Sequence, residues 1–407
     1  MVEVVVLGCG AIGLPLAVAL ASRGVRVTGF DIDREKVRFL RTGALGLLDE
    51  GLADALNAAL RSGAIAFTDA LEAASADRAY IIATPTPVDE NGRFIEAPLR
   101  QAMASVESVA RDGELVVVRS TTPVGTLRSL SEASRRSLAF AACPDRSVSG
   151  RAFAEQFTVP HLIGGLDAAA GEAARGLFAT LGEVRLVSSP EAAEATKLFA
   201  NVWRDARFAL ANQLALFCEG AGLDFEEIRS AGADGYPRFD LPRAGPVGGP
   251  CLTKDVYLLT QNTDADLRLF EAARTFNLSL AQHAAQRIAT EVAARASARV
   301  AVLGLAFKGS PPTLDQRGSI GLEIAKALRP SFELTTWDPA AEPRSAGVAA
   351  VVGAAAIVLA SDHPALADRR TLEGCAPGAF VYDLCGVLPE GTERAGLVVA
   401  RLGRGRR

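Results

Sequence analysis

Histidine and cysteine are scarce in this sequence, and their spacing excludes two classes of protein. The 407 residues include three histidines, at positions 161, 283 and 363, and six cysteines, at positions 9, 143, 218, 251, 375 and 385. None of the cysteines forms a C-x-x-C pair. A structural zinc site needs clustered ligands, and a disulfide scaffold needs densely spaced cysteines. We therefore predict neither a metal site nor a disulfide framework.

Signals for membranes and for nucleic acids are also missing. No apolar run reaches the length of a membrane span. The beginning, MVEVVVLGCGAIG, contains Glu3 and lacks the basic region and cleavage site of a secretory signal. The net charge is only −4, with both signs mixed along the chain, which gives no electrostatic reason to expect nucleic acid. We expect a cytoplasmic protein with no membrane and no nucleic-acid partner.

Length and composition indicate a folded protein of more than one domain. A chain of 407 residues exceeds one ordinary hydrophobic core, so two or three domains are expected. Hydrophobic residues make up 49% and charged residues 22%, which is typical of globular proteins rather than disordered or fibrous ones.

The first 33 residues have the pattern of a dinucleotide-binding βαβ unit. The β-branched run VEVVVL ends at Gly8-Cys-Gly-Ala-Ile-Gly13, a helical pattern follows, and the strand VRVTGFDID carries Asp31. In this unit Gly8 allows a tight turn, Gly10 lets the backbone approach a pyrophosphate, and Gly13 allows close packing of helix on strand. Asp31 can accept hydrogen bonds from ribose hydroxyls and would repel a 2′-phosphate, which favours NAD. Arg34 nearby leaves NADP open.

Further strands are expected at 79–84, 114–121 and 138–144, which continues an alternating α/β order. Polar residues follow two of them, in Thr84-Pro85-Thr86 and in Ser120-Thr121. Open parallel sheets bind ligands at the carboxyl ends of their strands. Pro, Ser and Thr also make ordinary turns, so both interpretations stay open for these residues.

The middle and the end of the chain differ in pattern. From Pro190 a long, largely apolar helical pattern contains Lys197 and Asn201, one turn apart and able to point at the same place. A solvated lysine is the alternative. After residue 262 another helical pattern follows, and from 299 strand patterns return at 332–339, 355–361, 379–386 and 396–403. The last third is therefore expected to be a second α/β domain, and its Gly304-x-x-x-Lys308 turn is a candidate second nucleotide site.

The stretch GPVGGPCLTKD, residues 245–255, places one cysteine between a glycine-rich turn and a Lys-Asp pair. Cys251 could be a buried apolar residue, a metal ligand or a nucleophile. The scattered histidines and cysteines make metal ligation the weakest option. A free cysteine is often a small buried hydrophobe, but the glycines and the Lys-Asp pair favour the nucleophile.

Taken in order, these motifs resemble the UDP-glucose/GDP-mannose dehydrogenases, or nucleotide-sugar 6-dehydrogenases. The resemblance covers essentially the whole chain. It rests on GCGAIG with FDID, TPTPVD, STTPVGT, CPDR, EATKLFANVWRDARFALANQLA, GGPCLTKD, VLGLAFKGSPPTLDQRGS and WDP. It implies two Rossmann-like parallel-sheet domains joined by a central helical domain. We expect an NAD-binding domain at 1–189, a dimerisation and catalytic domain at 190–297, and a nucleotide-sugar-binding domain at 298–407.

The resemblance implies a four-electron oxidation of the C6 hydroxymethyl group of a nucleotide hexose, in two NAD-dependent steps through a thiohemiacetal and a thioester on Cys251. The substrate expected first is UDP-glucose, and the protein is expected to be a homodimer. UDP-N-acetylmannosamine, UDP-N-acetylglucosamine and GDP-mannose are the alternatives. Two other hypotheses are a two-electron β-hydroxyacid dehydrogenase, against which residues 299–400 argue, and a nucleotide-sugar-binding regulator without activity.

The same resemblance assigns roles to individual residues. The catalytic set is Cys251, Lys197, Asn201, Asp255, Thr121 and Asp145. The NAD-binding set is Gly8, Gly10, Ala11, Ile12, Gly13, Asp31, Thr84, Pro85, Thr86, Ser120 and Thr121. The substrate-binding set is Lys197, Asn201, Arg238, Gly248, Gly249, Phe307, Lys308 and Arg317. Lys254 is expected to favour the thiolate, Asp315 to lie beside the diphosphate, and Arg243 competes with Arg238 for the role of a partner-subunit arginine.

Three positions depart from the family pattern. Asp145 stands where the family usually has Glu, Pro250 precedes the cysteine where His or Ser is more usual, and the strand ending YDLCG lacks an Arg often found there. These departures bear on the base and on the sugar contacts, and so on the identity of the substrate.

Overall fold

The computed structural model describes residues 2–46, 48–73, 76–293, 298–392 and 396–405. The chain divides into two compact units, Met1–Ala200 with Tyr257–Ala265, and Asn201–Val256 with Asp266–Arg407. The helix α8 (Pro190–Ala221) begins in the first unit and ends in the second. The expected division into three domains stays a prediction.

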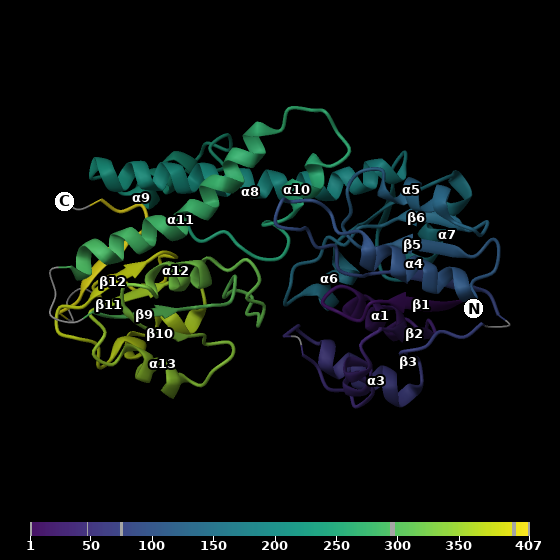
Figure 1. Cartoon of the computed structure of the whole chain (residues 1–407), viewed down its shortest axis with the longest axis horizontal. Coiled ribbons are helices and arrows are strands. Elements are labelled where there is room, and N and C mark those ends of the chain that lie inside the picture. Colours follow the sequence, from purple (N-terminus) through teal and green to yellow (C-terminus); the bar gives the residue numbers. More distant parts are fainter. Residues whose placement is uncertain (1, 47, 74–75, 294–297, 393–395, 406–407) are drawn as a thin grey trace. The chain divides into compact units, whose positions relative to one another are not determined.

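The first unit contains one sheet of strand order β3-β2-β1-β4-β5-β6-β7-β8, parallel except where β6 meets β7 (Figure 1). Its strands are β1 (Glu3–Leu7), β2 (Val27–Phe30), β3 (Ile65–Thr68), β4 (Arg78–Ile82), β5 (Leu115–Val118), β6 (Ala139–Ala142), β7 (His161–Gly165) and β8 (Val184–Leu186). Its helices are α1 (Gly13–Ser22), α2 (Arg34–Arg41), α3 (Leu52–Ser62), α4 (Ala97–Val109), α5 (Thr126–Ala133), α6 (Ala152–Thr158) and α7 (Ala168–Phe178).

The second unit contains a parallel sheet of order β10-β9-β11-β12-β13 (Figure 1). Its strands are β9 (Arg299–Leu303), β10 (Glu333–Trp337), β11 (Ala356–Leu359), β12 (Phe380–Asp383) and β13 (Val398–Arg401). Its other elements are α9 (Phe225–Ala233), α11 (Arg268–Val292), α12 (Ile320–Leu328), α13 (Arg344–Val351), η1 (Pro364–Ala367) and η2 (Arg369–Leu372), and α10 (Asp255–Thr260) crosses the division between the units.

Both sheets are covered on both faces, and the strand sequences show why. In β1, Val4 and Val6 belong to one apolar cluster while Val5 and Leu7 belong to another, and all four are fully buried. Successive side chains of a strand point to opposite faces. A strand covered on both faces therefore reads as a continuous apolar run, as the sequence of β1 does.

The expected α/β architecture is confirmed, with two differences in detail. The helical pattern that begins at Pro190 is interrupted, because Gly222 takes a left-handed conformation and Asp224 caps the new helix α9 through the amides of Glu226 and Glu227. The strands β3, β7 and β8 were not expected; β3 and β8 are short strands at the two edges of the sheet, and β7 lies next to β8. Residues 294–297 of the predicted second helical pattern lie outside the described residues.

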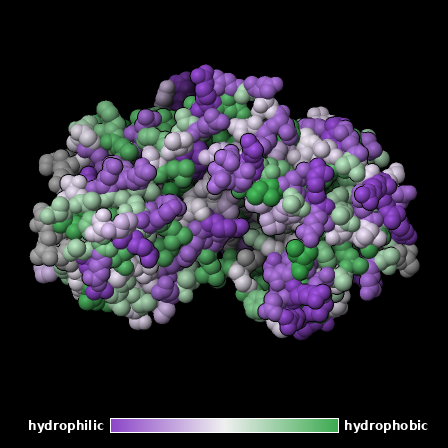
Figure 2. Space-filling view, in the orientation of Figure 1, coloured by the Kyte–Doolittle hydropathy of each residue, from purple (hydrophilic) through white to green (hydrophobic). Residues whose placement is uncertain are grey.

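The surface fits the mixed composition of the chain. Hydrophilic and hydrophobic side chains are interspersed over the face shown in Figure 2. Within the described residues no helix combines the length and the apolarity that a membrane span requires.

The turn between β1 and α1 depends on glycine at two positions and leaves space at a third. Gly8 has φ +94°, and a Cβ on it would lie 2.6 Å from the carbonyl oxygen of Ala83. A Cβ on Gly13 would lie 1.9 Å from the carbonyl oxygen of Gly8, whereas one on Gly10 would meet no atom within 4 Å. The backbone around Gly10 is therefore open on its outer side.

Gly13→Ala is expected to lower the free energy of unfolding by about 2 kcal/mol or more, because backbone atoms have to move. Gly10→Ala is the matched control and should change the stability by less than about 0.5 kcal/mol, since its new methyl group meets no protein atom. Urea unfolding followed by circular dichroism measures both. Equal stability of the two variants would contradict this account of the turn.

Candidate active site

The β1–α1 turn presents a helix N-terminus beside open space. The helix α1 begins at Gly13, directly after Gly10, Ala11 and Ile12. Helix N-termini favour anionic groups because their first amides lack partners within the helix. Asp31 lies after β2, and its carboxylate accepts hydrogen bonds from the Cys9 amide (2.9 Å) and from Lys36 Nζ (3.0 Å). In this structure Asp31 therefore holds the turn itself.

Two loops that the sequence analysis singled out lie together at the carboxyl ends of β4 and β5. The two strands are neighbours, and Ser120 Oγ donates a hydrogen bond to the carbonyl oxygen of Thr84 (2.7 Å). Thr86 and Thr121, which follow Thr84 and Ser120 in the sequence, are buried. Thr84 Oγ1 is buried and finds no hydrogen-bond partner among the described residues. An orphaned buried hydroxyl at this edge, together with the open turn at Gly10, fits a dinucleotide bound across the strand ends.

Glu194, which the sequence analysis did not single out, anchors the loop that carries Thr121. Its carboxylate accepts hydrogen bonds from the amides of Gly125 (2.7 Å) and Leu127 (2.9 Å) and from Thr122 Oγ1 (3.3 Å). Burial raises the pKa of Glu194 to about 7, although these three donors favour the charged form. The sequence offered one signal for Glu194, because it is an acidic residue three positions before Lys197. Lys197 is itself buried in the first unit.

Asp145 is buried in an ion pair that sequence reasoning did not foresee. Arg119 Nη2 lies 2.7 Å from its Oδ1, and Ser147 Oγ donates to its Oδ2 at 2.7 Å. Burial alone would raise the pKa of Asp145, but the Arg119 guanidinium outweighs this and holds the pKa below its usual range. Both carboxylate oxygens therefore have protein partners.

Cys251, in the second unit, is not a buried apolar residue, because its side chain is exposed and lies outside the apolar core. Its carbonyl oxygen accepts hydrogen bonds from the amides of Lys254 (3.1 Å) and Asp255 (2.9 Å), which forms a turn leading directly into α10. The thiol therefore lies on a helical turn immediately before a short helix.

Asp255 is the centre of a small polar cluster next to this turn. Its carboxylate is 1% exposed, Lys254 Nζ lies 2.8 Å from Oδ1, and Asn201 Nδ2 donates to Oδ2 at 2.6 Å. Lys254 is thus paired with Asp255. Arg317 is one cation that interacts electrostatically with Cys251. The structure brings Asn201, Lys254 and Asp255 together, and it pairs Lys254 with the carboxylate of Asp255; their catalytic roles stay predictions.

The predicted substrate-binding residues of the glycine turn and of the turn after β9 lie together in the second unit. A Cβ on Gly249 would lie 2.6 Å from the ring of Phe307, and one on Gly248 would lie 2.2 Å from the carbonyl oxygen of Gly318. The ammonium group of Lys308 lies 5.7 Å from the centre of the Phe307 ring. Arg317, next to Gly318, forms a two-point ion pair with Asp315.

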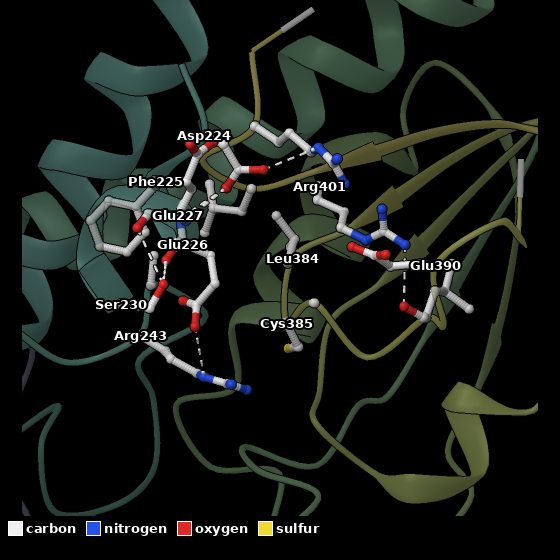
Figure 3. A pocket seen from close by; sticks show the side chains of 15 residues that line it. Asp224, Phe225, Glu226, Glu227, Ser230, Arg243, Leu384, Cys385, Glu390 and Arg401 are labelled. Atoms are coloured by element: carbon white, nitrogen blue, oxygen red, sulfur yellow. Dashed lines mark hydrogen bonds and ion pairs between the residues drawn. The ribbon is translucent and has the colours of Figure 1, made fainter. Parts of the chain in front are cut away.

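The two competing arginines lie in different surroundings. Arg238 is exposed and stacks over the ring of Tyr236 at 4.7 Å. Arg243 lines a cavity of about 520 Å³ in the second unit and pairs with Glu226 at 3.5 Å (Figure 3). The cavity is formed by the start of α9, residues 243–244, the loop after β12, and the end of β13, and Cys251 does not line it.

Comparison with known proteins identifies the family. The model of the UDP-glucose/GDP-mannose dehydrogenase family matches residues 2–182 with its NAD-binding domain and residues 191–279 with its central domain. The UDP-N-acetyl-D-mannosamine dehydrogenase of Pyrococcus horikoshii is 34% identical over 378 residues, which cover 89% of this chain and 90% of that protein. The NDP-N-acetyl-D-galactosaminuronic acid dehydrogenase of Ralstonia nicotianae is 31% identical over 79% of each chain.

A solved structure agrees with these matches. The UDP-D-ManNAc dehydrogenase from Pyrococcus horikoshii superposes with a TM-score of 0.89 at 29% sequence identity and covers 100% of both chains. These relatives are named for N-acetylated sugars, so they do not confirm UDP-glucose as the first expectation for the substrate. The chain belongs to the UDP-glucose/GDP-mannose dehydrogenase family and is an NAD-dependent nucleotide-sugar dehydrogenase.

Proposed function

We propose that this enzyme oxidises the C6 hydroxymethyl group of a UDP-N-acetylhexosamine to a carboxylate, with UDP-N-acetylmannosamine as the first candidate. The exposed Cys251, one turn ahead of the buried Asp255 cluster, carries the proposal for the reaction. The names of the relatives support the choice of sugar over UDP-glucose. The cytoplasmic location remains a prediction.

The electron count explains why a thiol is needed. Conversion of an alcohol to an acid removes four electrons, and each bound nicotinamide accepts one hydride, so two NAD molecules and one water are consumed per sugar. The thiolate of Cys251 adds to C6 of the aldehyde and forms a C–S bond. This thiohemiacetal loses the second hydride and becomes a thioester. Water then attacks C6, the C–S bond breaks, and the thiolate and the uronate carboxylate are released.

The Asp255 cluster is suited to moving protons next to the thiol. In our proposal Asp255, with a bound water, accepts the proton of the C6 hydroxyl group. Lys254 and Asn201 hold the two oxygens of this carboxylate, so its orientation is set before substrate binds. A carboxylate that is already oriented pays little entropy to reach the productive geometry.

The remaining catalytic roles follow from the family resemblance. Lys197 and Asn201 would stabilise the oxyanion that forms when hydride leaves or water adds. Thr121 and Asp145 would hold the hydrolytic water together with Asp255. The ion pair of Asp145 with Arg119 supports a role as a fixed acceptor for a water molecule, since an ionised carboxylate has further lone pairs for a donor.

We also propose that the enzyme is a homodimer that pairs through α8. Five large apolar residues on this helix are exposed at heptad-like spacing, namely Phe199, Trp203, Leu210, Leu214 and Phe217. Residues spaced by three, four and seven lie on one side of a helix. An exposed apolar stripe of this kind is costly in water and is typical of an interface.

For the reaction, two NADH per sugar are expected with UDP-N-acetylmannosamine in a panel that includes UDP-N-acetylglucosamine, UDP-glucose and GDP-mannose. Cys251→Ser should lower net turnover at least about 100-fold, because serine cannot form the thioester. Cys375→Ser, in the same unit, is the matched control and should keep full activity. Absorbance at 340 nm and chromatography of the sugars measure the ratio. A single NADH per sugar, or an active Cys251→Ser variant, would refute the thioester mechanism.

For the assembly, Phe217→Glu combined with Leu210→Glu should convert a dimer into a monomer, because two charges would be buried at the interface. Phe39→Glu is the control, since Phe39 is also exposed but lies on α2 in the first unit. Sedimentation velocity measures the mass of each variant. If the double variant keeps the mass of a dimer, the stripe on α8 is not the interface.

A further inference from the structure

The segment that carries Cys251 has an unusual demand for hydrogen bonds. Between the end of α9 at Ala233 and the start of α10 at Asp255 the chain has neither helix nor strand. A connection of this length in a compact protein is commonly functional. Its buried amide and carbonyl groups need partners that regular structure does not supply. In the described structure, side chains from α8 and α11 supply several of them.

The first contact holds the beginning of the glycine turn at two points. Asn212 on α8 is fully buried. Its Nδ2 donates to the carbonyl oxygen of Gly245 (3.0 Å), and its Oδ1 accepts from the amide of Gly245 (2.8 Å). A side-chain amide bonded to both polar groups of one residue fixes the orientation of that peptide.

The second contact lies on both sides of the thiol. Arg274 on α11 is 1% exposed. Its Nη2 donates to the carbonyl oxygen of Val247 (3.1 Å), and its Nη1 donates to that of Leu252 (3.3 Å). One guanidinium therefore joins a residue four positions before Cys251 to the residue directly after it. The fork of arginine is rigid, so the separation of these two carbonyl groups is set by the side chain.

A hydrogen-bonded network links the two contacts. Asp205 Oδ1 accepts from Arg274 Nη1 (2.8 Å) and from Asn277 Nδ2 (3.0 Å), and Asn277 Oδ1 accepts from Asn212 Nδ2 (3.0 Å). Asp205 balances the charge of Arg274, and all four side chains are buried. The two helices thus present one connected polar layer to the segment 245–252.

Contacts from elsewhere in the unit limit the same segment. Gly248 and Gly249 lie against Gly318 and the ring of Phe307, and the Gly249 amide donates to the carbonyl oxygen of Gly318 (3.3 Å). The side chain of Cys251 nevertheless stays exposed. The turn is therefore restrained on its backbone while its thiol remains accessible.

A purely stabilising function would not require a charged pair at this place. Buried ion pairs often contribute no more stability than apolar residues of the same volume, and their clearest benefit is a defined geometry. Here the geometry that is defined is that of the turn around the thiol. We propose that Arg274 and Asn212 are positioning residues, which hold the Cys251 turn in the arrangement that nucleophilic attack on C6 requires. This inference rests on the proposed function of Cys251.

Arg274→Lys and Asn212→Ser test the proposal in the full-length enzyme. Each should lower kcat at least about 10-fold and change KM less than about threefold, because the reacting thiol is displaced while the predicted contacts of Lys308 and Arg317 on the neighbouring turn remain. Arg287→Lys is the matched control, since Arg287 lies on the same helix in an ion pair with Glu219 and does not contact the turn. It should keep the activity of the original chain. Circular dichroism and the melting temperature report the folded fraction.

A second readout does not depend on turnover. Alkylation of Cys251 by iodoacetamide, followed by mass spectrometry with Cys375 as internal reference, should slow at least about fivefold at neutral pH in Arg274→Lys and in Asn212→Ser. The reason is that a displaced turn takes Cys251 away from the Arg317 guanidinium with which it interacts. Because alkylation needs no sugar, this result tests positioning even if the proposed oxidation fails.

Three outcomes would overturn the proposal. One is unchanged kcat and unchanged alkylation of Cys251 in both variants. Another is a loss of kcat that only matches the loss of folded protein, with normal alkylation of the folded fraction. The third is an equal loss in Arg287→Lys. If Arg274→Lys does not fold, Asn212→Ser decides the question alone, because it keeps the charged pair of Arg274 and Asp205.

Discussion

Burial of both faces of the two parallel sheets is the constraint on which the rest of this protein depends. Strands such as β1 and β9 are apolar on both sides because helices cover both sides. Polar chemistry then has to lie where strands end. The glycine turn after β1, the threonine loops after β4 and β5, and the Gly304 to Lys308 turn after β9 all lie at such ends. The architecture thus determines that ligands bind at the carboxyl ends of the strands in each sheet.

The two units use the same device at their first strand ends. In the first unit Asp31, after β2, accepts a hydrogen bond from the Cys9 amide of the glycine turn. In the second unit Asp338, after β10, accepts from the amides of Leu305 and Ala306 at 2.6 and 2.5 Å. A carboxylate at the end of the neighbouring strand holds the turn in both cases. The second nucleotide site, predicted from Gly304 and Lys308, stays a prediction.

Each unit also keeps a buried arginine–aspartate pair behind a loop of functional interest. Arg119 pairs with Asp145 in the first unit, and Arg274 pairs with Asp205 in the second. Such pairs cost desolvation free energy and are retained where a fixed direction of hydrogen bonds matters. Asp145, where the family resemblance leads us to expect glutamate, is held in this chain by its direct contact with Arg119. Asp145 is therefore a buried residue whose two carboxylate oxygens both have protein partners.

The sequence by itself determined the family, the α/β class, most strand positions, the NAD-binding turn and the thiol as a candidate nucleophile. These features depend on local patterns, namely glycines at set spacing, apolar runs and a Lys-Asp pair beside Cys251. Only the tertiary structure decided which side chains hold these motifs in place. Glu194, Arg119 and Arg274 contact loops that lie tens of residues away in the chain. Such pairings follow from which strands and helices lie side by side in the folded chain, which no spacing within one segment encodes.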